Sequence, residues 1–162
     1  MIYLIGSLRN PEIPKIAERL RAEGHEVFDD WFAAGPEADD FWRDYEKQRG
    51  HSLQQALRGY AAQHVFQFDR THLDRCSAAV LAWPAGKSGH LELGYVVGAG
   101  KPGYILLDGQ PERFDVMLNF ATGVFDKMED LIAALKEPVD SMVESLLDRD
   151  VHVAERGADS EP

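Results

Sequence analysis

The chain has 162 residues, 44% of them apolar and 28% charged, which is ordinary for one globular domain with a sizeable core. Acidic residues outnumber basic ones by 28 to 17, and the formal net charge of −11 disfavours nucleic-acid polymers and anionic membranes, although a local pocket can still hold a nucleotide. One cysteine, Cys76, leaves no intramolecular disulfide, and the N-terminus lacks a signal-peptide pattern, so we expect a cytoplasmic protein without a membrane partner.

The N-terminal residues predict a β-α-β unit. Residues 2–5 form a short apolar run that ends at a glycine, which is typical of a buried strand. A helix follows, because four apolar residues recur at helical spacing before Gly24: Ile13, Ile16, Ala17 and Leu20. Residues 25–28 predict the second strand. This unit favours a parallel sheet with a right-handed crossover.

The next segment interrupts this rhythm. Residues 29–36 form a loop rich in acids and aromatics, and residues 35–64 are polar with a helical composition that Gly50 divides in two. We interpret residues 35–64 as a helical insertion over the end of the sheet. The pattern leaves two roles open, a substrate lid and an oligomer contact.

The rest of the chain again alternates helices and strands. The predicted elements are a helix at 65–75, strands at 78–83, 103–107 and 124–125, a helix between 89 and 100, a short helix at 114–120, and helices at 128–136 and 139–147. The single domain is expected to cover residues 1–149. Residues 150–162 are polar and acidic and are predicted to be a disordered tail.

The segment from 78 to 102 is the strongest indication of a site. A buried strand leads into a glycine-rich turn at 84–89, and a helix follows with one acid, Glu92, in its expected first turn. In an open α/β sheet, ligands bind in the crevice at the carboxyl ends of the strands. The segment therefore predicts a small-molecule site that contains a carboxylate.

Three blocks, at residues 2–10, 68–77 and 89–102, together resemble the nucleoside 2-deoxyribosyltransferase family, which includes nucleoside 5'-monophosphate N-glycosidases. The resemblance spans residues 2–135 and leaves the insertion and the tail outside the family core. It implies an α/β fold of the flavodoxin-like, Rossmann-like kind: a three-layer sandwich with a five-stranded parallel sheet. It also implies a nucleoside or nucleotide substrate, no cofactor, and a homodimer or higher homo-oligomer with shared active sites.

The resemblance implies roles for particular acids. The family's nucleophile, a glutamate in a Glu-x-Gly motif, matches Glu92, and its acid/base aspartate matches Asp69. A carboxylate can attack the anomeric carbon while a second acid protonates the departing base. An asparagine lent by a neighbouring subunit corresponds to Asn119. The alternatives are a helix acid favoured by the macrodipole for Glu92 and a solvated acid or helix cap for Asp69.

Two departures from the family pattern favour a phosphorylated substrate. Enzymes for free nucleosides usually carry a further aspartate shortly before the nucleophile, where this chain has Gly-Lys-Ser-Gly at 86–89. They also tend to have an aromatic residue after the first strand, where this chain has Ser-Leu-Arg at 7–9. The residues predicted to cradle a phosphate are Gly6, Ser7, Arg9, Ser88 and Gly89. The alternative is a pair of tight turns with an exposed arginine.

Other residues are assigned to the same crevice with alternatives. Asp30 and Trp31 follow the second strand, and Trp31 either stacks on a base or packs in the core. His90 either contacts the sugar or Glu92, or acts as a local cap. The histidines show no metal-ligand spacing, so no metal site is predicted. Besides an enzyme, two classes stay open: a non-catalytic nucleotide-binding sensor of the same fold, and a flavodoxin-like FMN protein.

Overall fold

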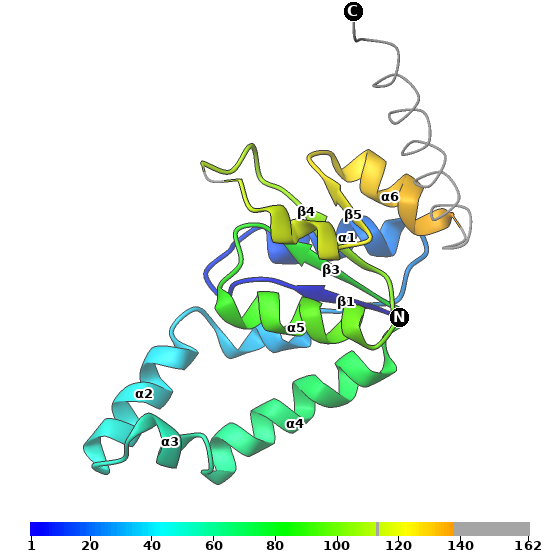
Figure 1. Ribbon diagram of the computed structural model, residues 1–162. Helices are drawn as coiled ribbons and strands as arrows, with labels where there is room; N and C mark the ends of the chain where they lie inside the picture. The colour runs from blue at the N-terminus through cyan, green and yellow to red at the C-terminus, as the bar shows by residue number, and fades with distance from the viewer. Residues whose placement is uncertain (113, 138–162) are drawn as a thin grey trace, which may run out of the picture.

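The computed structural model describes residues 1–112 and 114–137. Within these residues, five parallel strands form one sheet in the order β2-β1-β3-β4-β5 (Figure 1). The strands are β1 Ile2–Ile5, β2 Val27–Phe28, β3 Ala78–Ala82, β4 Gly103–Leu106 and β5 Gly123–Phe125. The α-helices are α1 Ile13–Ala22, α2 Ala38–Gln48, α3 Leu53–Ala56, α4 Tyr60–Arg75, α5 Lys87–Gly98 and α6 Met128–Lys136, and two 3-10 helices are η1 Asp30–Ala34 and η2 Val116–Phe120.

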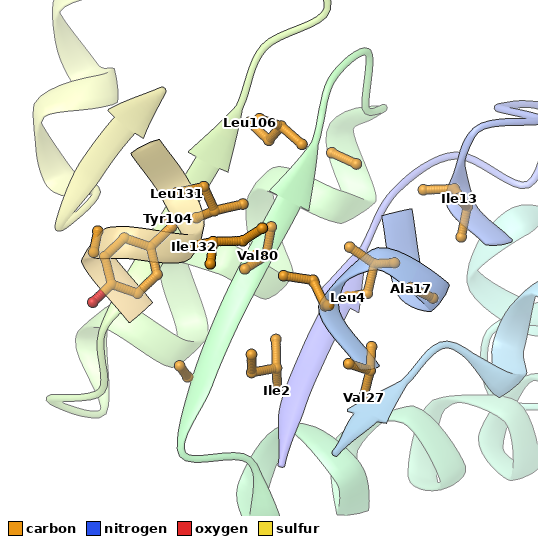
Figure 2. Close-up of a cluster of buried hydrophobic side chains, with 14 residues drawn as sticks. Ile2, Leu4, Ile13, Ala17, Val27, Val80, Tyr104, Leu106, Leu131 and Ile132 are labelled. Carbon is orange, nitrogen blue, oxygen red and sulfur yellow. The ribbon is translucent and has the colours of Figure 1, made fainter. Parts of the chain in front are cut away.

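Helices cover both faces of the sheet, which confirms the predicted three-layer α/β fold. Successive strand residues point to opposite faces, so β1 sends Ile2 and Leu4 to one side and Tyr3 and Ile5 to the other. The first side packs on α1 and α6, and Figure 2 shows its aliphatic side chains interdigitating around Val80. The second side packs on α4, α5 and η2. Both faces of the inner strands are therefore buried, as parallel sheets require.

The topology fixes where a crevice opens. From β1 the chain crosses to β2 at one edge and later returns to β3 on the other side of β1, where Ile5 pairs with Leu81. The helix after β1 covers one face of the sheet and the helix after β3 covers the other. The loops that follow β1 and β3 therefore diverge at the carboxyl edge, the place where such sheets bind ligands.

The predicted insertion forms a helical arm, residues 38–64, that extends away from the sheet (Figure 1). Gly50 has a φ of 73° and separates α2 from α3, as predicted. The predicted boundary near residue 64 is wrong, because α4 runs without a break from Tyr60 to Arg75. No glycine or proline follows Gly59 in this stretch, so nothing stops the helix at the end of the insertion.

Several element ends differ from the predictions. The helix α5 begins at Lys87, so Glu92 lies in its second turn and the predicted first-turn position is wrong. The first residues of α5 are polar or small and show no apolar periodicity. The sequence pattern therefore placed the start of this helix several residues too late. The predicted loop at 29–36 contains the short helix η1, and β2 is only two residues long. The predicted helix at 139–147 and the tail at 150–162 lie outside the described residues.

Candidate active site

Glu92 is a half-buried carboxyl on α5. Burial, and then the negative charge of Asp69, raise its pKa from 4.5 to about 7. Glu92 lies beyond the first turn of α5. The stabilisation of an acid by the helix macrodipole fades within one turn, so it does not explain Glu92 at this position. At neutral pH a carboxyl with this pKa is only partly ionised, and strongly shifted pKa values of this kind are often found at functional sites.

Asp69 lies on α4 and acts on Glu92 through its charge. Its Oδ1 atom is buried and has no hydrogen-bond partner among the described residues. Burial raises the pKa of Asp69, while the hydroxyl of Tyr3 and the charge of His72 oppose that rise. An unpaired buried carboxyl oxygen is costly to a fold, and active sites are where such costs are found.

Tyr3 brings a third acid to the same place. It is almost fully buried on β1, on the face that α4 and α5 cover. Burial, and then the charges of Glu92 and Asp69, raise the pKa of Tyr3 well above its ordinary value. Three acidic side chains from three elements therefore converge beneath α4 and α5, and Tyr3 stays a neutral hydroxyl beside the two carboxyls.

His72 is a further α4 side chain near enough for its charge to act on Asp69. Its ring stacks on Phe28 with centroids 3.8 Å apart and an interplanar angle of 11°. Its Nδ1 atom lies 2.8 Å from the carbonyl oxygen of Phe68, one turn earlier on α4. The ring is thus fixed from two directions, which holds a titratable group near Asp69 in a single orientation.

A network at the carboxyl end of α4 fixes α4 against α5. The hydroxyl of Tyr95, on α5, donates to the carboxylate of Asp74. The guanidinium of Arg70 lies over the Tyr95 ring, 4.7 Å from its centroid. The Nζ atom of Lys101 donates to the carbonyl oxygens of Leu73 and Asp74 at 3.0 and 2.6 Å. Since Asp69 and Glu92 belong to these two helices, this network sets their spacing.

The loop after β1 holds Ser7 and Arg9 beside the crevice. The Oγ atom of Ser7 accepts a bond from the backbone N–H of Arg9 at 3.2 Å. The Arg9 guanidinium is exposed and donates to Asp40 of the arm at 2.7 Å. A side chain at Gly6 would collide with Ile13, so this glycine allows α1 to approach β1. Ser7 and Arg9 thus follow β1 at the carboxyl edge of the sheet, and Arg9 is paired with an acid of the arm.

The start of α5 forms the opposite side of the crevice. Gly86 is its N-cap, and Ser88 is exposed in the first turn, where backbone N–H groups are free to bind an anion. Gly89 is buried, and a Cβ there would lie 3.0 Å from Ile5, so its small size lets α5 pack on β1. The Nδ1 atom of His90 lies 2.9 Å from the Gly86 carbonyl oxygen, the local cap weighed as its alternative role.

Comparison with known proteins gives a likeness in fold. No protein-family model matches the chain, and no curated protein matches it in sequence. A solved 2-deoxyribosyltransferase from the psychrotolerant bacterium Bacillus psychrosaccharolyticus, described as a biocatalyst for nucleoside synthesis, aligns with a TM-score of 0.55 at 20% identity. The alignment covers 87% of this chain and 94% of that chain.

The chain has the fold of a 2-deoxyribosyltransferase. This likeness agrees with the family resemblance of the three sequence blocks.

Two other predicted residues lie apart from the three acids. Trp31 is half-buried, its Nε1 atom donates to the Leu4 carbonyl oxygen at 2.8 Å, and its ring packs against both halves of the core, so packing accounts for it. Asp30 lines a neighbouring pocket of about 380 Å³ beside β2, together with Phe68 and His72. Asp69 and Glu92 are not among the residues that line this pocket.

Asn119 is exposed on η2, over the same face of the sheet as α5. No hydrogen bond between described residues joins it to Glu92 or Asp69. The prediction that Asn119 contributes to the active site of a neighbouring subunit concerns the oligomer and is not tested by a single chain.

Two further searches cover the same described residues. No three His, Cys, Asp or Glu side chains gather there as a metal-binding group. None of the helices in residues 1–112 and 114–137 is both long and apolar enough to cross a bilayer.

Proposed function

We propose that this protein breaks the N-glycosidic bond of a nucleoside or nucleoside 5'-monophosphate, with Glu92 as the nucleophile and Asp69 as the acid/base. The observation that carries the proposal is the pair of carboxyls on α4 and α5, with the pKa of Glu92 raised to about 7 by burial and by Asp69. The fold shared with a 2-deoxyribosyltransferase and the three sequence blocks support glycosidic chemistry for this pair.

The first step uses Glu92 as a carboxylate and Asp69 as a protonated acid. The Glu92 carboxylate attacks the anomeric carbon, and the bond from that carbon to the base nitrogen breaks with its electron pair going to the base. Asp69, whose pKa burial raises, gives its proton to the departing base. The product is a glycosyl ester on Glu92 and a neutral base.

The second step reverses the roles. Asp69, now a carboxylate, takes a proton from water or from an incoming base, which attacks the anomeric carbon and frees Glu92. Water gives a hydrolase and a base gives a transferase. Tyr3 stays neutral through both steps, because burial and the adjacent carboxyls raise its pKa.

The two loops of the crevice would hold the 5' end of the substrate. Ser7, Arg9, Ser88 and the first N–H groups of α5 offer a hydroxyl pair, a cation and a helix N-terminus, a set suited to a phosphate. We also propose a cytoplasmic homodimer or higher homo-oligomer in which Asn119 serves the neighbouring subunit.

Product analysis tests the proposal directly. The protein is incubated with deoxynucleosides and with their 5'-monophosphates, each with and without an acceptor base. Free base without an acceptor indicates a hydrolase, and base exchange indicates a transferase. Glu92→Ala is expected to lower kcat at least about 1000-fold, because the variant lacks the carboxylate that would form the covalent glycosyl intermediate. Equal release of base by Glu92→Ala and the parent protein contradicts the assignment of the nucleophile.

The same samples separate the other two functional classes. A sensor of this fold binds nucleotide tightly in calorimetry and releases no base. An FMN protein is yellow when purified. Either result, without base release, replaces the glycosidic proposal.

A further inference from the structure

The carboxylate of Asp40, on α2, is held by two arginines at once. Its Oδ2 atom accepts from Arg9 at 2.7 Å and its Oδ1 atom accepts from Arg43 at 2.6 Å. Arg43 is also bound to Asp44, at 2.8 Å. Two guanidinium groups on the two oxygens of one carboxylate form the arrangement with which proteins bind an anion.

This ion pair joins two parts of the chain that are far apart in sequence. Arg9 belongs to the loop after β1, and Asp40 belongs to the arm. Of the hydrogen bonds and ion pairs between described residues, the Arg9–Asp40 pair alone links the arm to loop 6–10. The arm thus supplies a negative charge to the arginine on which a substrate phosphate would depend.

We propose that Asp40 is a specificity-determining residue, whose carboxylate occupies the Arg9 guanidinium in place of the substrate's 5'-phosphate. This inference rests on the proposed function. A phosphorylated substrate must displace Asp40 from Arg9, whereas an unphosphorylated nucleoside leaves the pair intact. Asp40 therefore weakens the binding of monophosphates and leaves nucleosides unaffected.

The exposure of the pair sets the size of the effect. The side chains of Arg9 and Asp40 are 65% and 38% exposed. An ion pair this open to water is weak, so a dianionic phosphate can replace the carboxylate. Arg43 keeps Asp44 and Asp40 as partners when Arg9 is released, so displacement leaves no charge on the arm unpaired.

Asp40→Asn removes the competing charge, and Asp44→Asn is the matched control. Asp44 lies on the same helix and binds Arg43 without touching Arg9. We expect Asp40→Asn to tighten the Kd for deoxynucleoside 5'-monophosphates about fivefold, with the Kd for the matching deoxynucleosides unchanged. Asp44→Asn is expected to match the parent protein for both ligands.

The Arg9→Ala background locates the effect. If Asp40 acts by occupying Arg9, then Arg9→Ala and Arg9→Ala/Asp40→Asn bind monophosphates equally. The inference is overturned by an equal gain from Asp44→Asn, by an equal gain for nucleosides, or by a gain that persists without Arg9. An unchanged or undetectable monophosphate affinity in Asp40→Asn overturns it as well.

Calorimetry on the full chain keeps this test separate from the proposed function, because it measures binding and needs no turnover. Selective gain of monophosphate affinity in Asp40→Asn supports the inference even in a protein that releases no base. Base release combined with unchanged affinities in Asp40→Asn supports the proposed function and overturns the inference. Failure of the inference can therefore be told apart from failure of the proposed function.

Discussion

At the scale of single residues, the burial of Glu92 has a consequence for stability. Its pKa is raised from 4.5 to about 7, so between these values the folded chain binds a proton that the unfolded chain releases. The contribution of this carboxyl to stability is therefore complete below pH 4.5 and is lost as the pH rises through 7. A charged Glu92 in the closed site destabilises the fold.

Glu92→Gln removes this titration. At pH 8 the variant is expected to be more stable than the parent protein by up to about 3 kcal/mol, and at pH 4 the two are expected to be equal. Denaturant unfolding at both pH values measures the difference. Glu129→Gln, an exposed acid in the first turn of α6, is the control. A Glu92→Gln variant less stable than the parent at pH 8 contradicts the raised pKa.

Removing the hydroxyl oxygen of Tyr3 tests how this side chain affects the pKa of Asp69. Its hydroxyl lowers the pKa of Asp69 against the effect of burial, so Tyr3→Phe is expected to raise that pKa further. Carboxyl carbon NMR shifts of Asp69 across a pH series measure it. Tyr104→Phe, on the opposite face of the sheet, serves as the comparison and is expected to leave Asp69 unchanged. Identical Asp69 titration in Tyr3→Phe and the parent would exclude the contact.

The two carboxyls were identified from the sequence in different ways. Glu92 follows a buried strand and a glycine-rich turn, whereas Asp69 was assigned only through the family resemblance. Tyr3 was missed, although a tyrosine in an aliphatic strand is itself a signal that its hydroxyl needs a partner. Asp40 could not be predicted, because its role depends on how the arm folds back toward Arg9.

At the scale of elements, the close approach of α5 to the sheet depends on Gly103. A Cβ at this position on β4 would lie 2.6 Å from Val97 and 2.8 Å from Leu93. Gly103→Ala is therefore expected to push α5 outward and to destabilise the fold by about 1–3 kcal/mol. Gly98→Ala is the control: a Cβ there meets nothing within 4 Å, and a gain of up to about 1 kcal/mol is expected.

Denaturant unfolding of both variants gives the two free energies. Because α5 carries Glu92, Gly103→Ala is also expected to lower activity in substrate assays, which Gly98→Ala leaves intact. Equal stability of the two alanine variants would show that α5 can accommodate a Cβ atom at Gly103 without moving outward.

Element ends were harder to predict than elements themselves. The apolar period that reveals α1 and the buried runs that reveal β1 and β3 were sufficient, since each is repeated over several residues. The start of α5 carries no such period, because its first residues are polar or glycine. The continuity of α4 was missed because burial changes along it: its first turns belong to the arm and its last turns pack on the sheet.

At the scale of the whole molecule, the five-stranded parallel sheet could be predicted from the alternation of helices and strands combined with the family resemblance. Local patterns do not determine which edge of β1 receives β3, since that choice is made by packing both helical layers at once. The arm is the opposite case. It was recognised as an insertion from its composition. The ion pair that joins it to loop 6–10 and its direction away from the sheet can be known only from the fold (Figure 1).

The surface over α5 and η2 predicts how copies of the chain associate. Leu91, Val116, Met117 and Phe120 are each at least 60% exposed, and groups of exposed apolar side chains often mark contact sites between proteins. Asn119 lies among them, and Leu91 adjoins Glu92. A second copy that covers this surface would bury the apolar side chains and bring Asn119 toward the neighbouring site, as the resemblance implies.

Phe120→Glu places a charge in the centre of this surface and is expected to convert a dimer into monomers in light scattering, because an unpaired buried charge is costly. If the proposed assembly shares its sites between subunits, activity is expected to fall with the dimer fraction. Phe41→Glu on the arm, with 68% exposure against 72% for Phe120, is the matched control and is expected to stay dimeric. Monomers produced by Phe41→Glu and not by Phe120→Glu would move the contact to the arm.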